Sequence, residues 1–251
     1  MPLVRGPLFV CIRMRPLAAV LAVALLAAAG VWAIGFATGR GLPAGVFPGH
    51  AVLSGLVVAV DAGHGGQDRG ACFLAEGLVE KEINLDVAGR VGERLERLGA
   101  RVVMVRSDDA FVELDERAKV ANEAAADVLV SIHVNRIPGH PDCYGAQVFY
   151  FPGREASERL AALIQEELVA VDPDNYRRAL PGEYRILRLA QMPAAIVEIG
   201  FITNERDRGL LASSEYRDRV AGAIVSGIAR FALETRGESP VGQGGPEALG
   251  E

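Results

Sequence analysis

The sequence predicts a single α/β domain with a largely parallel sheet flanked by helices, preceded by one membrane-spanning helix. Short apolar runs alternate with amphipathic helical patterns between residues 56 and 235, as in layered α/β folds. The mean hydropathy of +0.22 is high for a chain in which 23% of the residues are charged. Residues 17–37 account for much of this excess, because they form 21 consecutive residues without a charge.

The apolar segment at residues 17–37 is long enough to cross a bilayer. At ~1.5 Å per residue, a helix of this length spans roughly 30 Å, the thickness of the hydrocarbon core. Arg5, Arg13 and Arg15 precede the segment, and positive residues mark the cytoplasmic end of such helices. We therefore expect a single-pass protein of the cell membrane, with its folded domain on the extracytoplasmic side.

A cleaved signal peptide is the alternative to this anchor. Small residues at 33–37 offer a cleavage site, and cleavage would release a secreted protein. The apolar region of a signal peptide is normally only about 7–15 residues long, which favours an uncleaved signal anchor. The expected segments are a cytoplasmic N-terminus (1–16), the transmembrane signal anchor (17–37), a Gly- and Pro-rich linker (38–55), the folded domain (56–235) and a disordered tail (236–251).

The charge of the chain excludes one class of partner. The formal net charge of −6 divides into +4 for residues 1–60, which contain four arginines and no acid, and −10 for the rest. An acidic domain lacks the cationic surface that phosphate contacts require, so we expect no nucleic acid partner. Three cysteines in 251 residues likewise exclude a small domain stapled by disulfides.

The predicted elements follow from apolar runs and helical periodicity. The helix over 82–98, for example, repeats Ile83, Val87 and Val91 on one face, and Gly99 suits its C-terminal cap. The predicted strands are 56–61, 101–105, 127–132, 146–151 and 194–199. The predicted helices are 82–98, 113–124, 155–169 and 214–233.

Polar side chains lie at the ends of three predicted strands. His64 follows the first strand in a glycine-rich turn, DAGHGG (61–66), His133 follows the third strand, and Glu198 interrupts the apolar last strand. Ligands of such sheets bind at the carboxyl ends of the strands, so we expect these side chains to converge there. Neutral imidazole and carboxylate are common Zn²⁺ ligands, which predicts a metal site at this edge.

The third ligand and the role of Glu198 stay open at this level. Glu80 and Glu82 both lie near the start of a predicted helix, where the helix dipole favours a carboxylate. A carboxylate in a buried strand is costly unless it is paired or functional. Glu198 is therefore either a general base beside the metal or the partner of an arginine such as Arg117 or Arg185.

Further polar residues have two interpretations each. Asp61 either orients a metal ligand or caps the glycine-rich turn. Asn135 either contacts substrate or braces the site. Cys72 and Cys143 follow the two histidines in loops and could form a disulfide or offer thiolate ligands, whereas Cys11 precedes the apolar segment as a free thiol.

Four motifs follow one another along the chain: DAGHGG (61–66), GLVEKEINL (77–85), SIHVN (131–135) and VEIGFITN (197–204). In this order they resemble the zinc-dependent N-acetylmuramoyl-L-alanine amidases of amidase type 3. The family hydrolyses the amide bond between N-acetylmuramic acid and L-alanine in peptidoglycan. The resemblance covers about residues 57–235 and implies a sheet of about six strands.

The resemblance also implies a set of site residues. It assigns His64, Glu80 and His133 as the ligands of one zinc ion per chain, and so selects Glu80 over Glu82. It assigns Glu198 as the catalytic glutamate, which takes a proton from water and gives it to the leaving amine. Peptidoglycan is then the expected substrate.

A narrower resemblance concerns biological role. The segment GAQVFYFP (145–152) and the anchored single-domain layout are similar to the amidases of spore cortex formation, which remove the peptide before the muramic δ-lactam forms. Only 65 residues separate His133 from Glu198, which leaves little room for the inserted helix that blocks the zinc site of cell-division relatives. We expect control by expression, metal occupancy or an activator protein instead.

Two rival functions would use the same fold. A zinc peptidase acting on stem peptides could have the same site chemistry, because fold does not determine the substrate. A metal-free wall-binding module could keep the fold without catalysis. The intact set of two histidines and two glutamates speaks against that module.

Overall fold

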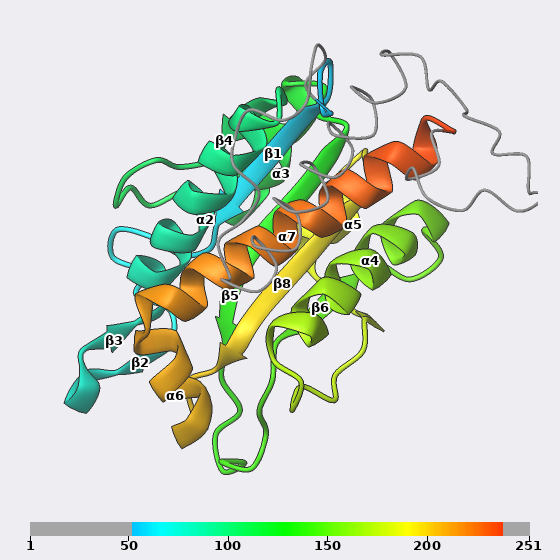
Figure 1. Cartoon of the computed structure of the whole chain (residues 1–251). Helices are drawn as coiled ribbons and strands as arrows, with labels where there is room; N and C mark the ends of the chain where they lie inside the picture. Colours follow the sequence, from blue (N-terminus) through cyan, green and yellow to red (C-terminus); the bar gives the residue numbers. More distant parts are fainter. Residues whose placement is uncertain (1–51, 238–251) are drawn as a thin grey trace, which may run out of the picture. The chain divides into compact units, whose positions relative to one another are not determined.

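The computed structural model describes residues 52–237, which form one α/β domain around a six-stranded sheet (Figure 1). Strands β4, β1, β5 and β8 are parallel, β6 is antiparallel to β8, and the short β7 is parallel to β6. The prediction of a largely parallel six-stranded sheet is therefore confirmed. In sheet order the strands are β4 (Arg101–Met104), β1 (Val57–Ala62), β5 (Val128–Asn135), β8 (Ala194–Phe201), β6 (Gln147–Tyr150) and β7 (Leu180–Pro181).

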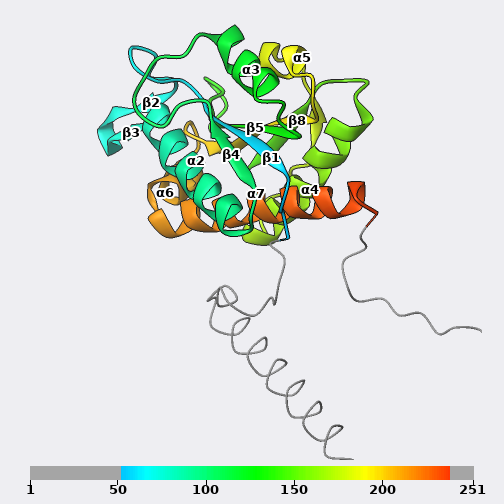
Figure 2. The same ribbon diagram turned by 90° about the horizontal axis from the view of Figure 1, so that it is seen from above.

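Helices cover both faces of the sheet and give the domain three layers (Figure 2). One face is covered by α2 (Glu80–Arg97), α4 (Glu155–Val171) and α7 (Ser214–Thr235), and the opposite face by α3 (Leu114–Glu123) and α5 (Arg185–Leu189). A hairpin and α6 lie at the end toward which β5 and β8 point (Figure 1). These elements are β2 (Cys72–Phe73), η1 (Leu74–Glu76), β3 (Leu78–Val79) and α6 (Glu205–Ala212).

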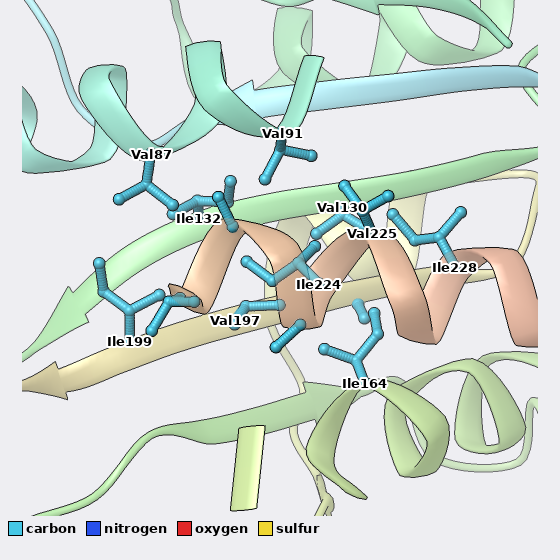
Figure 3. Close-up of a cluster of buried hydrophobic side chains, with 14 of the residues drawn as sticks. Val87, Val91, Val130, Ile132, Ile164, Val197, Ile199, Ile224, Val225 and Ile228 are labelled. Atoms are coloured by element: carbon cyan, nitrogen blue, oxygen red, sulfur yellow. The ribbon is translucent and has the colours of Figure 1, made fainter. Parts of the chain in front are cut away.

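The strands bury alternate residues in the two helical layers, because successive side chains of a strand point to opposite faces. Val130 of β5 and Val197 of β8 pack with side chains of α2, α4 and α7 (Figure 3). Leu129 and Ile196 belong to the smaller cluster under α3 and α5. The same alternation places His133, at the end of β5, on the α3/α5 face of the sheet.

Element boundaries differ from the prediction at several points. Helix α2 begins at Glu80, two residues before the predicted start, and β5 continues to Asn135. Leu53, within the predicted linker, is fully buried, and its N–H donates to the Leu98 carbonyl. The folded domain therefore begins before residue 56. The hairpin, β7, α5 and α6 were not predicted, because they are too short to show a period.

The predicted membrane segment cannot be compared with the structure. Residues 1–51 and 238–251, which include the expected anchor at 17–37 and most of the linker and tail, lie outside the described residues. Within residues 52–237, no helix combines the length and the apolar composition that a membrane span requires.

Helices α4 and α7 pack closely at a glycine. A side-chain carbon added at Gly227 of α7 would lie 2.6 Å from the Cα atom of Ile164 in α4. Such a contact is shorter than van der Waals packing allows, and backbone atoms of two packed helices cannot move apart locally. The absence of a side chain at Gly227 therefore sets the distance between these helices.

We predict that Gly227→Ala lowers the free energy of unfolding by about 1–3 kcal/mol through overpacking. Gly89→Ala is the matched control, because Gly89 is also helical but has no neighbouring atom within 4 Å of the added carbon. There, alanine should raise the stability by roughly 0.5–1 kcal/mol through helix propensity. Urea denaturation of both variants measures the difference, and equal effects would contradict this account of the α4–α7 contact.

Candidate metal centre and active site

The strand register brings the polar strand ends together on the α3/α5 face. His133 of β5 is paired with Glu198 of β8, and Asp61 of β1 is paired with Ser131 of β5. Neighbouring residues in register point to the same face of a sheet. The expected convergence of the first, third and last predicted strands is therefore observed in the structure.

The glycine-rich turn after β1 brings His64 to the same place. His64 itself has a left-handed backbone, with φ of 61°, which is uncommon outside glycine. A side chain at Gly63 would collide with the imidazole of His133, and one at Gly70 would lie 2.6 Å from Glu80 Oε2. Both glycines are therefore needed for the chain to pass this close to the histidines and the glutamate.

Glu80, not Glu82, lies with the two histidines. Glu80 Oε1 is 3.1 Å from His64 Nε2 and 3.1 Å from His133 Nδ1. One potential ligand atom from each of these three residues lies within 4.8 Å of the others. Glu82 is exposed on the first turn of α2. Two imidazoles and one carboxylate converging in this way fit the donor set of a catalytic zinc site.

Backbone donors hold the Glu80 carboxylate in place. Its Oε1 accepts a hydrogen bond from the Val134 N–H at 3.0 Å, and its Oε2 accepts one from the Ala71 N–H at 2.6 Å. Burial alone would favour the neutral acid, but hydrogen bonds and charge from His133 and His64 outweigh it and hold the pKa of Glu80 well below its usual range. Glu80 is therefore an anion ready to bind a cation.

The histidines respond to the same carboxylate. Burial disfavours the charged form of His64, but Glu80 and Asp68 outweigh this and raise the pKa of His64 to about 9. Burial also opposes the charged form of His133, yet the same glutamate raises its pKa. A metal ion and protons therefore compete for these nitrogens, since only neutral imidazole binds metal.

Glu198 lies beside this cluster without an arginine partner. Arg117 instead pairs with Asp61 at 2.7 Å, and Arg185 pairs with Asp115. The ion-pair alternative for Glu198 is therefore wrong. Glu198 is 8% exposed, and its Oε2 has no hydrogen-bond partner among the described residues. Burial raises its pKa to about 7, with the nearby charges acting in both directions, so this carboxyl can both take and release a proton near neutral pH.

Asp61 acts on the site through an arginine. Its carboxylate is fully buried and accepts hydrogen bonds from Arg117 at 2.7 Å and from Ser131 Oγ at 2.6 Å. Arg117 in turn donates to the carbonyls of Ala62 and His64. Among the described residues, the Asp61 side chain therefore hydrogen-bonds neither to the N–H groups of the turn nor to a ligand imidazole, but fixes the arginine that holds the turn.

Two supporting residues escaped the sequence prediction. Asp68 Oδ2 is 2.7 Å from His64 Nδ1, which leaves His64 Nε2 to face Glu80. An acid four residues after a candidate ligand was the available signal. Arg106 is 3% exposed and donates to the carbonyls of Ala62 and Gly63. No local sequence pattern predicts that Arg106 binds these carbonyls, because the contact depends on the pairing of β4 with β1.

The remaining candidates do not belong to the cluster of potential metal ligands. Asn135 is half-buried at the end of β5, on the same face as His133, and its position is next to Phe201. Cys72 and Cys143 are free thiols in the structure, so the disulfide that they could form is not present. Neither thiol belongs to the group of potential metal ligands in residues 52–237.

Comparison with known proteins decides the family. The model of the N-acetylmuramoyl-L-alanine amidase family matches residues 58–230. The chain belongs to this family. Its enzymatic activity is therefore hydrolysis of the amide bond between N-acetylmuramic acid and L-alanine of peptidoglycan.

Individual relatives agree with this assignment. The chain is 41% identical over 178 residues to the uncharacterized protein YqiI of Bacillus subtilis. The matched region covers 70% of this chain and 84% of YqiI. The chain is also 35% identical over 204 residues to the germination-specific N-acetylmuramoyl-L-alanine amidase of Bacillus subtilis, covering 75% and 84%. The CwlD amidase of Clostridioides difficile, solved in complex with the GerS lipoprotein, has a TM-score of 0.69 at 32% identity, covering 71% and 99%.

We predict that Arg117→Met lowers the free energy of unfolding by about 3–5 kcal/mol, because it leaves the Asp61 carboxylate buried without its counter-charge. Arg185→Met is the matched control, since it removes the same group from an exposed pair with Asp115. Exposed pairs contribute little to stability, so the control should unfold close to the wild type. Similar losses in both variants would contradict the proposed importance of the buried pair.

Proposed function

We propose that this amidase is zinc-dependent, with one Zn²⁺ bound by His64, Glu80 and His133. The observation that carries the proposal is the position of Glu80 Oε1, 3.1 Å from a nitrogen of each imidazole. Two histidine rings, nearly perpendicular to each other with an interplanar angle of 78°, meet one anionic oxygen and form a compact set of donors that no hydrophobic packing requires. A zinc ion held there supplies Lewis-acid polarisation of the scissile carbonyl.

Glu198 is the proton carrier in this proposal. Its carboxylate takes a proton from the attacking water as the water oxygen bonds to the lactyl carbonyl carbon. The carbon–nitrogen bond then breaks, and Glu198 gives the proton to the alanine nitrogen. The products are the lactyl carboxylic acid on the sugar and a free amino group on the peptide. The pKa of about 7 that burial gives Glu198 suits both transfers.

Asn135 and Asp61 have supporting roles in this proposal. Asn135 lies two residues beyond His133 on the same face of β5 and is placed to contact the substrate. Asp61 keeps Arg117 against the backbone of the turn that carries His64. Asp68 orients the His64 ring through Nδ1 in the manner of an outer partner of a metal ligand.

We also propose a role in maturation of the spore cortex, with the peptide removed before the muramic δ-lactam forms. The similarity to a germination-specific amidase supports this role. The segment between His133 and Glu198 contains two helices, α4 and the short α5. Helix α5 packs against α3 and β8 as part of the layered fold, which supports the expectation that this segment carries no inserted blocking helix. The complex of the similar CwlD amidase with a lipoprotein supports control by a separate activator protein.

The cellular placement follows from the sequence. We propose that residues 17–37 anchor the chain in the cell membrane, with the catalytic domain on the extracytoplasmic side where peptidoglycan lies. A secreted domain, released by signal cleavage, is the alternative. The acidic charge of the domain supports the absence of a nucleic acid partner.

The test of this function is digestion of purified peptidoglycan by the full chain with and without Zn²⁺, followed by mass spectrometry of the soluble products. We predict zinc-dependent release of stem peptides that carry an L-alanine N-terminus. Cleavage only within the stem would identify a zinc peptidase instead. Equal release after chelation would contradict the zinc proposal.

We predict that Glu198→Gln lowers the rate of peptide release by about 10²- to 10⁴-fold, the usual contribution of a general base. Bound zinc, measured by atomic absorption, should stay at one per chain, because Glu198 is not among the ligands. Glu82→Gln is the matched control, since it removes an exposed carboxylate two residues from Glu80. Full activity of Glu198→Gln would eliminate Glu198 as the base.

A further inference from the structure

Arg177 carries an uncompensated guanidinium beside the candidate active site. Its Nε donates to the Tyr144 carbonyl at 2.8 Å, and its Nη1 donates to Gln147 Oε1 at 3.4 Å. Its Nη2 is buried and has no hydrogen-bond partner among the described residues. No carboxylate of residues 52–237 lies within ion-pair distance of Arg177, although the domain as a whole is acidic.

A register pair and a hydrogen bond to Gln147 place this guanidinium on the face that carries the site. Gln147 of β6 is paired with Glu198 of β8, and directly opposed residues of antiparallel strands share a face. The Arg177 guanidinium also lies 4.7 Å from the centre of the Phe201 ring. Phe201 is the β8 partner of Asn135, beyond an irregularity in the register after His133 and Glu198, so it places Arg177 near the end of β8 but does not by itself fix the face.

The surroundings of Arg177 hold its guanidinium without neutralising it. The rings of Tyr176 and Phe201 lie 4.9 Å and 4.7 Å from its central carbon, and aromatic faces attract a cation. The two buried arginines among the described residues differ from the half-buried Arg177: Arg117 pairs with a carboxylate, and Arg106 uses each of its nitrogens on backbone carbonyls. A buried donor atom without a partner, such as Nη2, is costly, so a structural role alone does not explain Arg177.

We propose that Arg177 receives a free carboxylate of the substrate peptide and so selects acidic stem peptides. This inference rests on the proposed function. In the substrate, the lactyl carboxyl group of muramic acid is consumed in the scissile amide, so free carboxylates belong to the peptide side. The planar guanidinium, with an unused N–H group on Nη2, matches carboxylate geometry. Of the two rings beside the guanidinium, Phe201 is 1% exposed and Tyr176 is 61% exposed, so the surface side of Arg177 is the Tyr176 side.

The experiment compares two forms of one polymer. Peptidoglycan is digested by the full chain either untreated or after its carboxyl groups are converted to amides with carbodiimide and ammonia, and peptide release is timed at limiting substrate. The wild type should release peptides from the untreated form about 10- to 100-fold faster, the usual effect of a hydrogen bond to a charged group. Arg177→Gln should lose this preference by slowing on untreated polymer alone.

Arg178→Gln is the matched control, because it removes the same charge from the adjacent exposed residue and should keep the preference. Arg177→Lys keeps the charge but not the fork, and should show an intermediate preference. Equal rates of the wild type on both polymers, or an unchanged preference in Arg177→Gln, would overturn the carboxylate receptor and leave the zinc-dependent amidase intact. Failure of the wild type on both polymers would instead overturn the proposed function and the receptor with it.

Discussion

The buried carboxylate of Glu80 is the point at which the separate parts of this site meet. It is the first residue of α2, yet its oxygens accept N–H groups from Ala71 before the hairpin and from Val134 in β5. The imidazoles of His64 and His133 approach the same oxygen. Because a buried anion is stable only when it is fully hydrogen-bonded or paired, the start of α2, the end of β5 and the turn after β1 must keep their relative positions.

The layered fold supplies the rest of the geometry. Alternation along the strands gives one face of the sheet to the large core under α2, α4 and α7, and leaves the polar strand ends on the other face. The antiparallel direction of β6 also shapes the site. Because β6 runs opposite to β8, its first residue, Gln147, lies beside Glu198 near the carboxyl end of β8. Two buried arginines then hold the turn that carries His64. Both donate hydrogen bonds to backbone carbonyls of this segment, and Arg117 is itself fixed by its ion pair with Asp61.

The layered fold and the strand ends that carry His64, His133 and Glu198 could be predicted from the sequence. Apolar runs and isolated polar residues are local signals that can be read without knowing the packing. The sequence did not separate Glu80 from Glu82 without a family resemblance, since helix starts are uncertain by about two residues. Contacts that depend on strand order were out of reach. The arginine partners of the turn and the position of Arg177 arise only when distant segments are packed, and no spacing along the chain encodes them.

In the proposed site, Glu80 joins the two histidines around one zinc ion. Zinc K-edge X-ray absorption of the zinc-loaded full chain probes this coordination. We predict a first shell of nitrogen and oxygen atoms at about 2.0–2.1 Å, with outer-shell scattering from two imidazole rings and no sulfur. In Glu80→Gln, zinc occupancy should fall while the fold is kept. A sulfur shell at about 2.3 Å, or an unchanged spectrum and occupancy in Glu80→Gln, would show that Glu80 and the two histidines do not bind the zinc together.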